Sequence, residues 1–129
     1  MGWGPGTYQF VYAPMQLSRE KTFISTNAGD MGNAHSEYLG PLAEMGLIGM
    51  LLVLAIVAVV LTTGIKIYRK ALDREIRMLS LSAVLALVTY FTHGLINNFL
   101  DSDKASIPVW GFMAMIVAMD VFYAKTKNN

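Results

Sequence analysis

The chain has 129 residues, of which 54% are hydrophobic and 15% are charged, and its formal net charge is +1. This composition is too apolar for an ordinary soluble domain of this length, and the small net charge excludes bulk attraction to nucleic acid. The absence of cysteine excludes a disulfide framework, a thiolate metal site and a thiol nucleophile. We therefore expect a membrane protein with no nucleic-acid partner.

Residues 1–44 form the least regular part of the chain. Three glycines and a proline among the first six residues favour turns. Residues 7–12 have the β-branched and aromatic content of a strand, but a short amphipathic helix fits them equally well, so their structure stays open. Asn33 suits the N-cap of a short surface helix near residues 34–44. This helix is expected to break or restart at Pro41, with Pro41 as an early residue of the following segment. The region is predicted to be a loop that carries one short helix.

Three apolar stretches with little or no charge follow, and each predicts a transmembrane helix. Residues 45–65 contain no charge, and at about 1.5 Å per residue their length matches a hydrocarbon core roughly 30 Å thick. Residues 78–100 are also long enough to cross. Residues 107–124 form the weakest of the three, because Asp120 lies near their end. The predicted fold class is an all-α membrane protein with three transmembrane helices.

The positions of Lys and Arg predict the orientation of these helices. The basic loop at residues 66–77 holds five of them and the tail at 125–129 adds two, whereas three lie in residues 1–44 and the short loop at 101–106. Loops rich in Lys and Arg stay on the cytoplasmic side during insertion. We therefore expect loop 66–77 and the tail in the cytoplasm, and residues 1–44 and 101–106 outside, which in a bacterium means the periplasm.

His35 is the main candidate for a catalytic residue. It lies about ten residues before the first predicted span, next to side chains that form hydrogen bonds, among them Glu37 and Tyr38. A neutral imidazole is suited to accept a proton near neutral pH, so His35 is a candidate general base. The alternative is an interfacial histidine without a chemical role, because an amphipathic ring is tolerated at a membrane surface.

His93 and Asn97 are polar residues in the second predicted span. Polar groups at that depth are costly unless they face the protein interior or a wet cavity. Hydrogen bonding between helices explains them, and so does a cavity shared with His35 on the outer side. In a transporter or channel they would instead line a pore.

Two further features of the outer loops have ordinary explanations as well as functional ones. Arg19, in a small charged cluster, is a candidate phosphate contact or a solvated surface residue. The Asp101-Ser102-Asp103 pair has the form of a divalent-cation site, but a solvated turn accounts for it, so we expect no metal and no cofactor.

Three segments together resemble the C-terminal part of the O-antigen ligase family, which includes O-antigen polymerases and related pilin-glycosylating transferases. They are Gly2-Trp3-Gly4-Pro5-Gly6-Thr7-Tyr8, Ala34-His35-Ser36-Glu37-Tyr38-Leu39 and Ala43-Glu44-Met45-Gly46-Leu47-Ile48-Gly49. The closing spans, with His93-Gly94-Leu95 and Asn97-Asn98-Phe99-Leu100-Asp101, also look similar to that family. The resemblance covers most of the chain.

The resemblance implies a multi-pass glycosyltransferase of the bacterial inner membrane, active in lipopolysaccharide or polysaccharide biosynthesis. It would move a glycan from an undecaprenyl diphosphate carrier to an acceptor hydroxyl, such as one on lipid A-core, in the periplasm. It also implies that His35 activates the acceptor without a metal. Glu37 or Tyr38 would position the acceptor for this step. Further candidates for substrate binding are Arg19, His93 and Asn97.

Members of that family have roughly a dozen spans, and the arginines thought to hold the diphosphate lie in parts that would precede residue 1 here. The chain is therefore expected to be the C-terminal portion of such an enzyme, which needs the remaining N-terminal spans or a partner chain. The alternative is a small three-span membrane partner or assembly subunit without catalysis. The sequence predicts neither the sugars nor whether the reaction is ligation, polymerisation or protein glycosylation.

Overall fold

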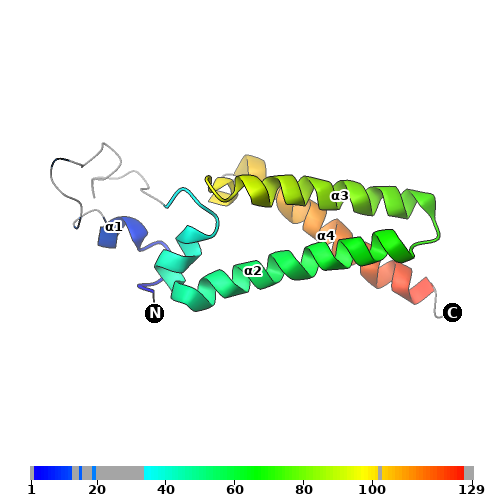
Figure 1. Cartoon of the computed structure of the whole chain (residues 1–129), viewed down its shortest axis with the longest axis horizontal. Coiled ribbons are helices and arrows are strands. Elements are labelled where there is room, and N and C mark those ends of the chain that lie inside the picture. Colours follow the sequence, from blue (N-terminus) through cyan, green and yellow to red (C-terminus); the bar gives the residue numbers. More distant parts are fainter. Residues whose placement is uncertain (1, 13–14, 16–18, 20–33, 102, 127–129) are drawn as a thin grey trace. The chain divides into compact units, whose positions relative to one another are not determined.

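The structure, a computed structural model, describes residues 2–12, 15, 19, 34–101 and 103–126. Every regular element in these ranges is a helix (Figure 1). The elements are α1 (Tyr8–Tyr12), α2 (Leu39–Lys70), α3 (Arg74–His93), the short 3₁₀ helix η3 (Phe99–Asp101) and α4 (Asp103–Thr126). Residues 7–12, which fitted a strand or a helix, thus contain the short helix α1, in which Tyr8 stacks on Tyr12 at 5.1 Å.

Three of these helices are long and apolar enough to cross a membrane, which confirms the predicted all-helical class with three candidate spans. The apolar stretches are Leu39–Lys70, Arg74–His93 and Lys104–Phe122. Within the first, large side chains such as those of Leu47 and Ile48 are 60% and 68% exposed. Burying such groups is strongly favourable in water, so this surface is suited to an apolar surrounding.

The C-terminal end of α2 and both ends of α3 differ from the ranges that the positions of the charged residues predicted. The basic segment at 66–77 was expected to be a loop, but α2 runs to Lys70 and α3 starts at Arg74, because Lys and Arg are good helix formers. Asp73 caps α3 by accepting the Glu75 N–H at 2.8 Å. The second span was expected to reach residue 100, but α3 ends at His93, where Gly94 is its C-cap.

The helix α2 is interrupted at Gly46 rather than at Pro41. Gly46 has φ 72° and ψ −166°, a backbone conformation open essentially to glycine alone, and it divides α2 into two helical parts. Pro41 lies in the first turn of α2, where the missing N–H of a proline is tolerated. Pro41 is thus an early residue of the helix that follows, as expected, but no break occurs there, and the break lies five residues later.

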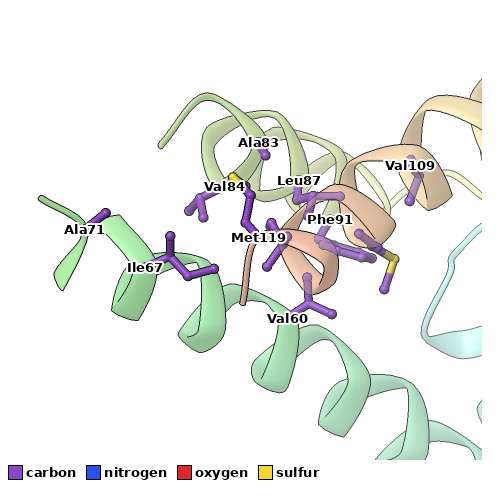
Figure 2. Packing of buried hydrophobic residues seen from close by; sticks show 11 residues of the cluster. Val60, Ile67, Ala71, Ala83, Val84, Leu87, Phe91, Val109 and Met119 are labelled. Carbon is purple, nitrogen blue, oxygen red and sulfur yellow. The ribbon is translucent and has the colours of Figure 1, made fainter. Parts of the chain in front are cut away.

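The chain divides into two compact units. The first consists of residues 1–54 together with the short segment 95–98, and the second consists of residues 55–94 and 99–129. The second unit contains the hydrophobic core, in which side chains from α2, α3 and α4 face one another (Figure 2). Leu87 of α3 and Ile116 of α4 are fully buried at its centre.

Close contact between α2 and α3 depends on a glycine. The buried Ser80 hydroxyl of α3 donates a hydrogen bond to the Gly64 carbonyl of α2 at 2.7 Å. A Cβ atom at residue 64 would collide with the Val84 side chain and would lie 3.2 Å from Cδ1 of Ile116. Small residues allow helix backbones to approach each other closely in this way, so Gly64 fixes the spacing of the three core helices.

Replacing Gly64 with alanine is therefore expected to destabilise the second unit by about 1–3 kcal/mol, because the added methyl group overfills the core. Gly111 in α4 is the matched control, since a Cβ there meets no atom within 4 Å. Gly111→Ala should leave the stability unchanged or slightly raised. Unfolding followed by circular dichroism in detergent micelles measures both variants, and equal stability of the two would contradict this packing.

Candidate functional site

The first unit is organised around Glu44, near the end of the first part of α2. One carboxylate oxygen accepts the Gly6 N–H at 2.7 Å and the other accepts the Tyr8 N–H at 3.3 Å. A carboxylate at the start of a helix is favoured by the free N–H groups there, and α1 begins at Tyr8. The side chain of Glu44 therefore holds the N-terminal segment against α2.

The backbone of Glu44 makes a second connection. The non-helical backbone at Gly46 ends the first helical part of α2, and carbonyls at the end of a helix generally lack a helical donor. The Glu44 carbonyl accepts the Gly4 N–H at 2.8 Å instead. Gly2 lies so close to it that a Cβ atom would overlap the Glu44 carbonyl group. The glycines of residues 2–6 thus allow the backbone of this segment to lie directly against the backbone of α2 at Glu44.

The start of α2 is fixed by Ser36. Its hydroxyl oxygen accepts the N–H groups of Tyr38 and Leu39, both at 3.3 Å, and its carbonyl accepts the Gly40 N–H at 3.0 Å. This is the geometry of a helix N-cap, and the Ser36 side chain is buried. The cap that we predicted, Asn33, lies outside the described residues.

His35 directly precedes this cap and is not part of a helix, although a short helix near 34–44 was expected to include it. Its φ of 46° places it in the left-handed region, where histidine is one of the few residues other than glycine to be enriched. Its side chain is exposed. The buried Ser36 on one side and the left-handed turn at His35 itself therefore fix the backbone that presents the imidazole.

Glu37 and Tyr38 lie in the turn between the cap and α2, and both side chains are partly exposed. Burial raises the pKa of the Tyr38 phenol, and the charge of Glu37 raises that pKa further. A phenol with a raised pKa keeps its proton at neutral pH, so the Tyr38 side chain carries an O–H donor there. The cap thus places a carboxylate and a hydroxyl donor within three residues of His35.

The structure separates the remaining predicted residues. Asn97 belongs to the same compact unit as His35, because segment 95–98 is part of the first unit. His93 belongs to the second unit, where its exposed ring stacks on Phe99 with centroids 5.5 Å apart and planes 9° apart. Arg19 is exposed. Among the described residues, no three His, Asp or Glu side chains gather as a metal site would require.

Two residues that organise this region had no predicted role. Glu44 and Gly46 were part of the segment Ala43-Glu44-Met45-Gly46-Leu47-Ile48-Gly49 that resembles the O-antigen ligase family, but neither was given a role of its own. The signal available was the combination of a carboxylate just before an apolar span with a glycine-rich segment that offers free N–H groups. That combination predicts an anion held by backbone donors.

Comparison of the chain with protein-family models, with curated proteins and with solved structures gave no match.

Proposed function

We propose that the chain is the C-terminal portion of an O-antigen ligase-like glycosyltransferase of the bacterial inner membrane. In this proposal residues 1–44 lie in the periplasm, and the donor is a glycan linked to undecaprenyl diphosphate. The acceptor is a carbohydrate hydroxyl, such as one on lipid A-core. The three apolar helices are compatible with a multi-pass membrane protein, and the motifs around His35 support this particular class.

One observation carries the proposal: an exposed histidine is held in a left-handed turn by a buried helix cap, immediately before an apolar helix. Backbone conformations that few residues adopt gather at functional sites, where the surrounding structure holds them. An imidazole at this place can reach a substrate whose lipid carrier is in the bilayer. The glycine-rich segment held by Glu44 adds a second fixed element to the same unit.

In the proposed reaction, His35 acts as the general base. A ring nitrogen takes the proton of the acceptor hydroxyl, and the oxygen attacks the anomeric carbon of the donor sugar. The bond from that carbon to the diphosphate oxygen breaks, and the electron pair leaves with the undecaprenyl diphosphate. Tyr38 and Glu37 position the acceptor through hydrogen bonds, and Asn97 is a further candidate contact within the unit.

The departing diphosphate requires positive charge, because two phosphates carry the electrons released by bond cleavage. In residues 1–44 and 101–106 the sequence offers Arg19, Lys21 and Lys104. Lys21 lies outside the described residues. We therefore assign most of this cationic role to further spans of the enzyme or to a partner chain, with Arg19 as the contribution of this segment.

The experiment is a transfer assay in inverted and right-side-out membrane vesicles from cells that express the gene with its natural reading frame. The probe is an undecaprenyl diphosphate-linked glycan with a radiolabelled sugar, and the acceptor is purified lipid A-core. The label is expected to move to the acceptor in right-side-out vesicles, where the outer face is accessible. Absence of transfer in both vesicle types, with the protein present and inserted, would contradict the proposed function and favour a partner subunit.

A further inference from the structure

A hollow of about 490 Å³ lies at the C-terminal end of α2, within the second unit. It is lined by Thr62, Ile65, Lys66, Arg69 and Lys70. Residues at this spacing lie on one face of a helix, and the volume is in the range of sites that bind small ligands. Three of the five lining residues carry a positive charge, so the hollow is suited to an anion.

The positive charges of this site are not paired with acidic side chains of the described residues. Within the part of the chain that the structure describes, Lys66, Arg69 and Lys70 form no ion pair with an acidic side chain. Cations at the end of a helix are stabilised by its free carbonyls, so the three can stay together despite their mutual repulsion. Arg77 is engaged elsewhere, over the Tyr68 ring at 5.3 Å from its centroid.

The walls of the hollow combine apolar and polar groups. Ile65 is 46% exposed, and Val59, about one turn before Thr62, is 62% exposed. The Thr62 hydroxyl donates to the carbonyls of Ala58 and Val59 at 2.7 and 3.0 Å, so its lone pairs remain available as acceptors. A free inorganic anion makes no favourable contact with the apolar side chains, whereas a lipid can place its acyl chain along them.

The depth of the hollow agrees with a lipid headgroup. From the break at Gly46 to Lys66 the helix rises about 1.5 Å per residue, which gives a length close to the roughly 30 Å of a hydrocarbon core. The basic residues thus begin where the apolar stretch ends. Basic pockets at this level in membrane proteins bind anionic headgroups.

We propose that this hollow binds the phosphodiester headgroup of an anionic membrane lipid. Arg69 and the two lysines hold the phosphate, and the apolar side chains of Ile65 and Val59 hold the first part of an acyl chain. The site lies at the end of α2 remote in sequence from His35, and it does not depend on the proposed glycan transfer.

The test measures lipid retention by the purified full chain in dodecyl maltoside micelles, using native mass spectrometry. Phosphatidylglycerol, phosphatidylcholine with the same acyl chains and inorganic phosphate are titrated separately. Phosphatidylglycerol is expected to bind more tightly than phosphatidylcholine. Inorganic phosphate at equal concentration should not displace it.

Two independent variants examine the site. Lys66→Gln with Arg69→Gln should weaken phosphatidylglycerol binding by about 25-fold, since each basic residue contributes about fivefold. Thr62→Trp fills the hollow without changing the charge and should lower binding to the level of phosphatidylcholine. The control, Arg74→Gln with Lys104→Gln, removes the same charge at two residues that do not line the hollow and should bind like the original protein.

Three results would overturn the proposal. Equal loss in the site and control variants would show a diffuse charge effect, and unchanged binding by Thr62→Trp would show that the hollow is not occupied. Displacement of the lipid by inorganic phosphate would assign the site to a free anion. Circular dichroism of each variant establishes that it is folded before binding is measured.

Discussion

Replacing His35 with alanine or asparagine is expected to lower glycan transfer by about 10²- to 10⁴-fold, the usual contribution of a general base. The two variants differ in their effect on the backbone. Asparagine adopts left-handed conformations readily, so His35→Asn keeps the turn at φ 46° and removes only the imidazole. His35→Ala removes the imidazole and also strains the turn. The measurement is the transfer rate in right-side-out vesicles at equal protein levels.

Comparison of the two variants distinguishes a role of His35 as the general base from a role in shaping the turn before α2. If His35 acts as the base, both variants lose transfer to a similar extent. If His35 only shapes the turn before α2, His35→Asn keeps its activity and His35→Ala alone declines. Glu75→Gln, an exposed change at the start of α3, is the control for expression and insertion, and it should transfer at the original rate.

Replacing Gly46 with alanine is expected to change the course of α2. The conformation at φ 72° and ψ −166° costs a residue with a Cβ about 1–3 kcal/mol, whereas alanine favours a continuous helix. We therefore expect α2 to straighten in Gly46→Ala. The Glu44 carbonyl would then regain a helical donor and would no longer need the Gly4 N–H, so the N-terminal segment loses a contact.

Spin labels measure this change directly, because the chain has no cysteine of its own. Cysteines at the exposed positions Leu39 and Leu54 carry the labels within the first unit. In Gly46→Ala the backbone separation should lengthen toward about 23 Å, the value for a straight helix of this length. Gly40→Ala is the matched control, because a Cβ there meets nothing within 4 Å. A distance distribution identical in all three proteins would contradict a glycine-dependent break.

The number of long apolar helices could be predicted from the sequence, because a stretch with little charge shows how long and how apolar a helix can be. Their ends were less predictable. The Lys and Arg residues between positions 66 and 77 predict the cytoplasmic loop. They are also good helix formers, so α2 continues to Lys70. At the other end of α3, Gly94 stops the helix within a range that hydropathy treats as continuous.

The candidate site was predictable only in part. His35 was identified by its residue type and position, but its left-handed backbone depends on the turn that Ser36 caps. The break at Gly46 lies beside a contact with a residue forty positions earlier in the chain, the hydrogen bond from the Gly4 N–H to the Glu44 carbonyl. Patterns within one helix carry no information on such distant pairings. A proline is the stronger local signal, and it pointed to residue 41.

The most direct measurement of the central claim, that His35 takes the proton of the acceptor, is chemical rescue of His35→Gly by added imidazole. Glycine tolerates the left-handed turn and leaves space where the side chain was. We expect His35→Gly to be nearly inactive in the transfer assay, and we expect imidazole in the buffer to restore transfer in proportion to its concentration. Transfer by His35→Gly at the original rate, or an inactive variant that imidazole leaves inactive, would contradict this claim.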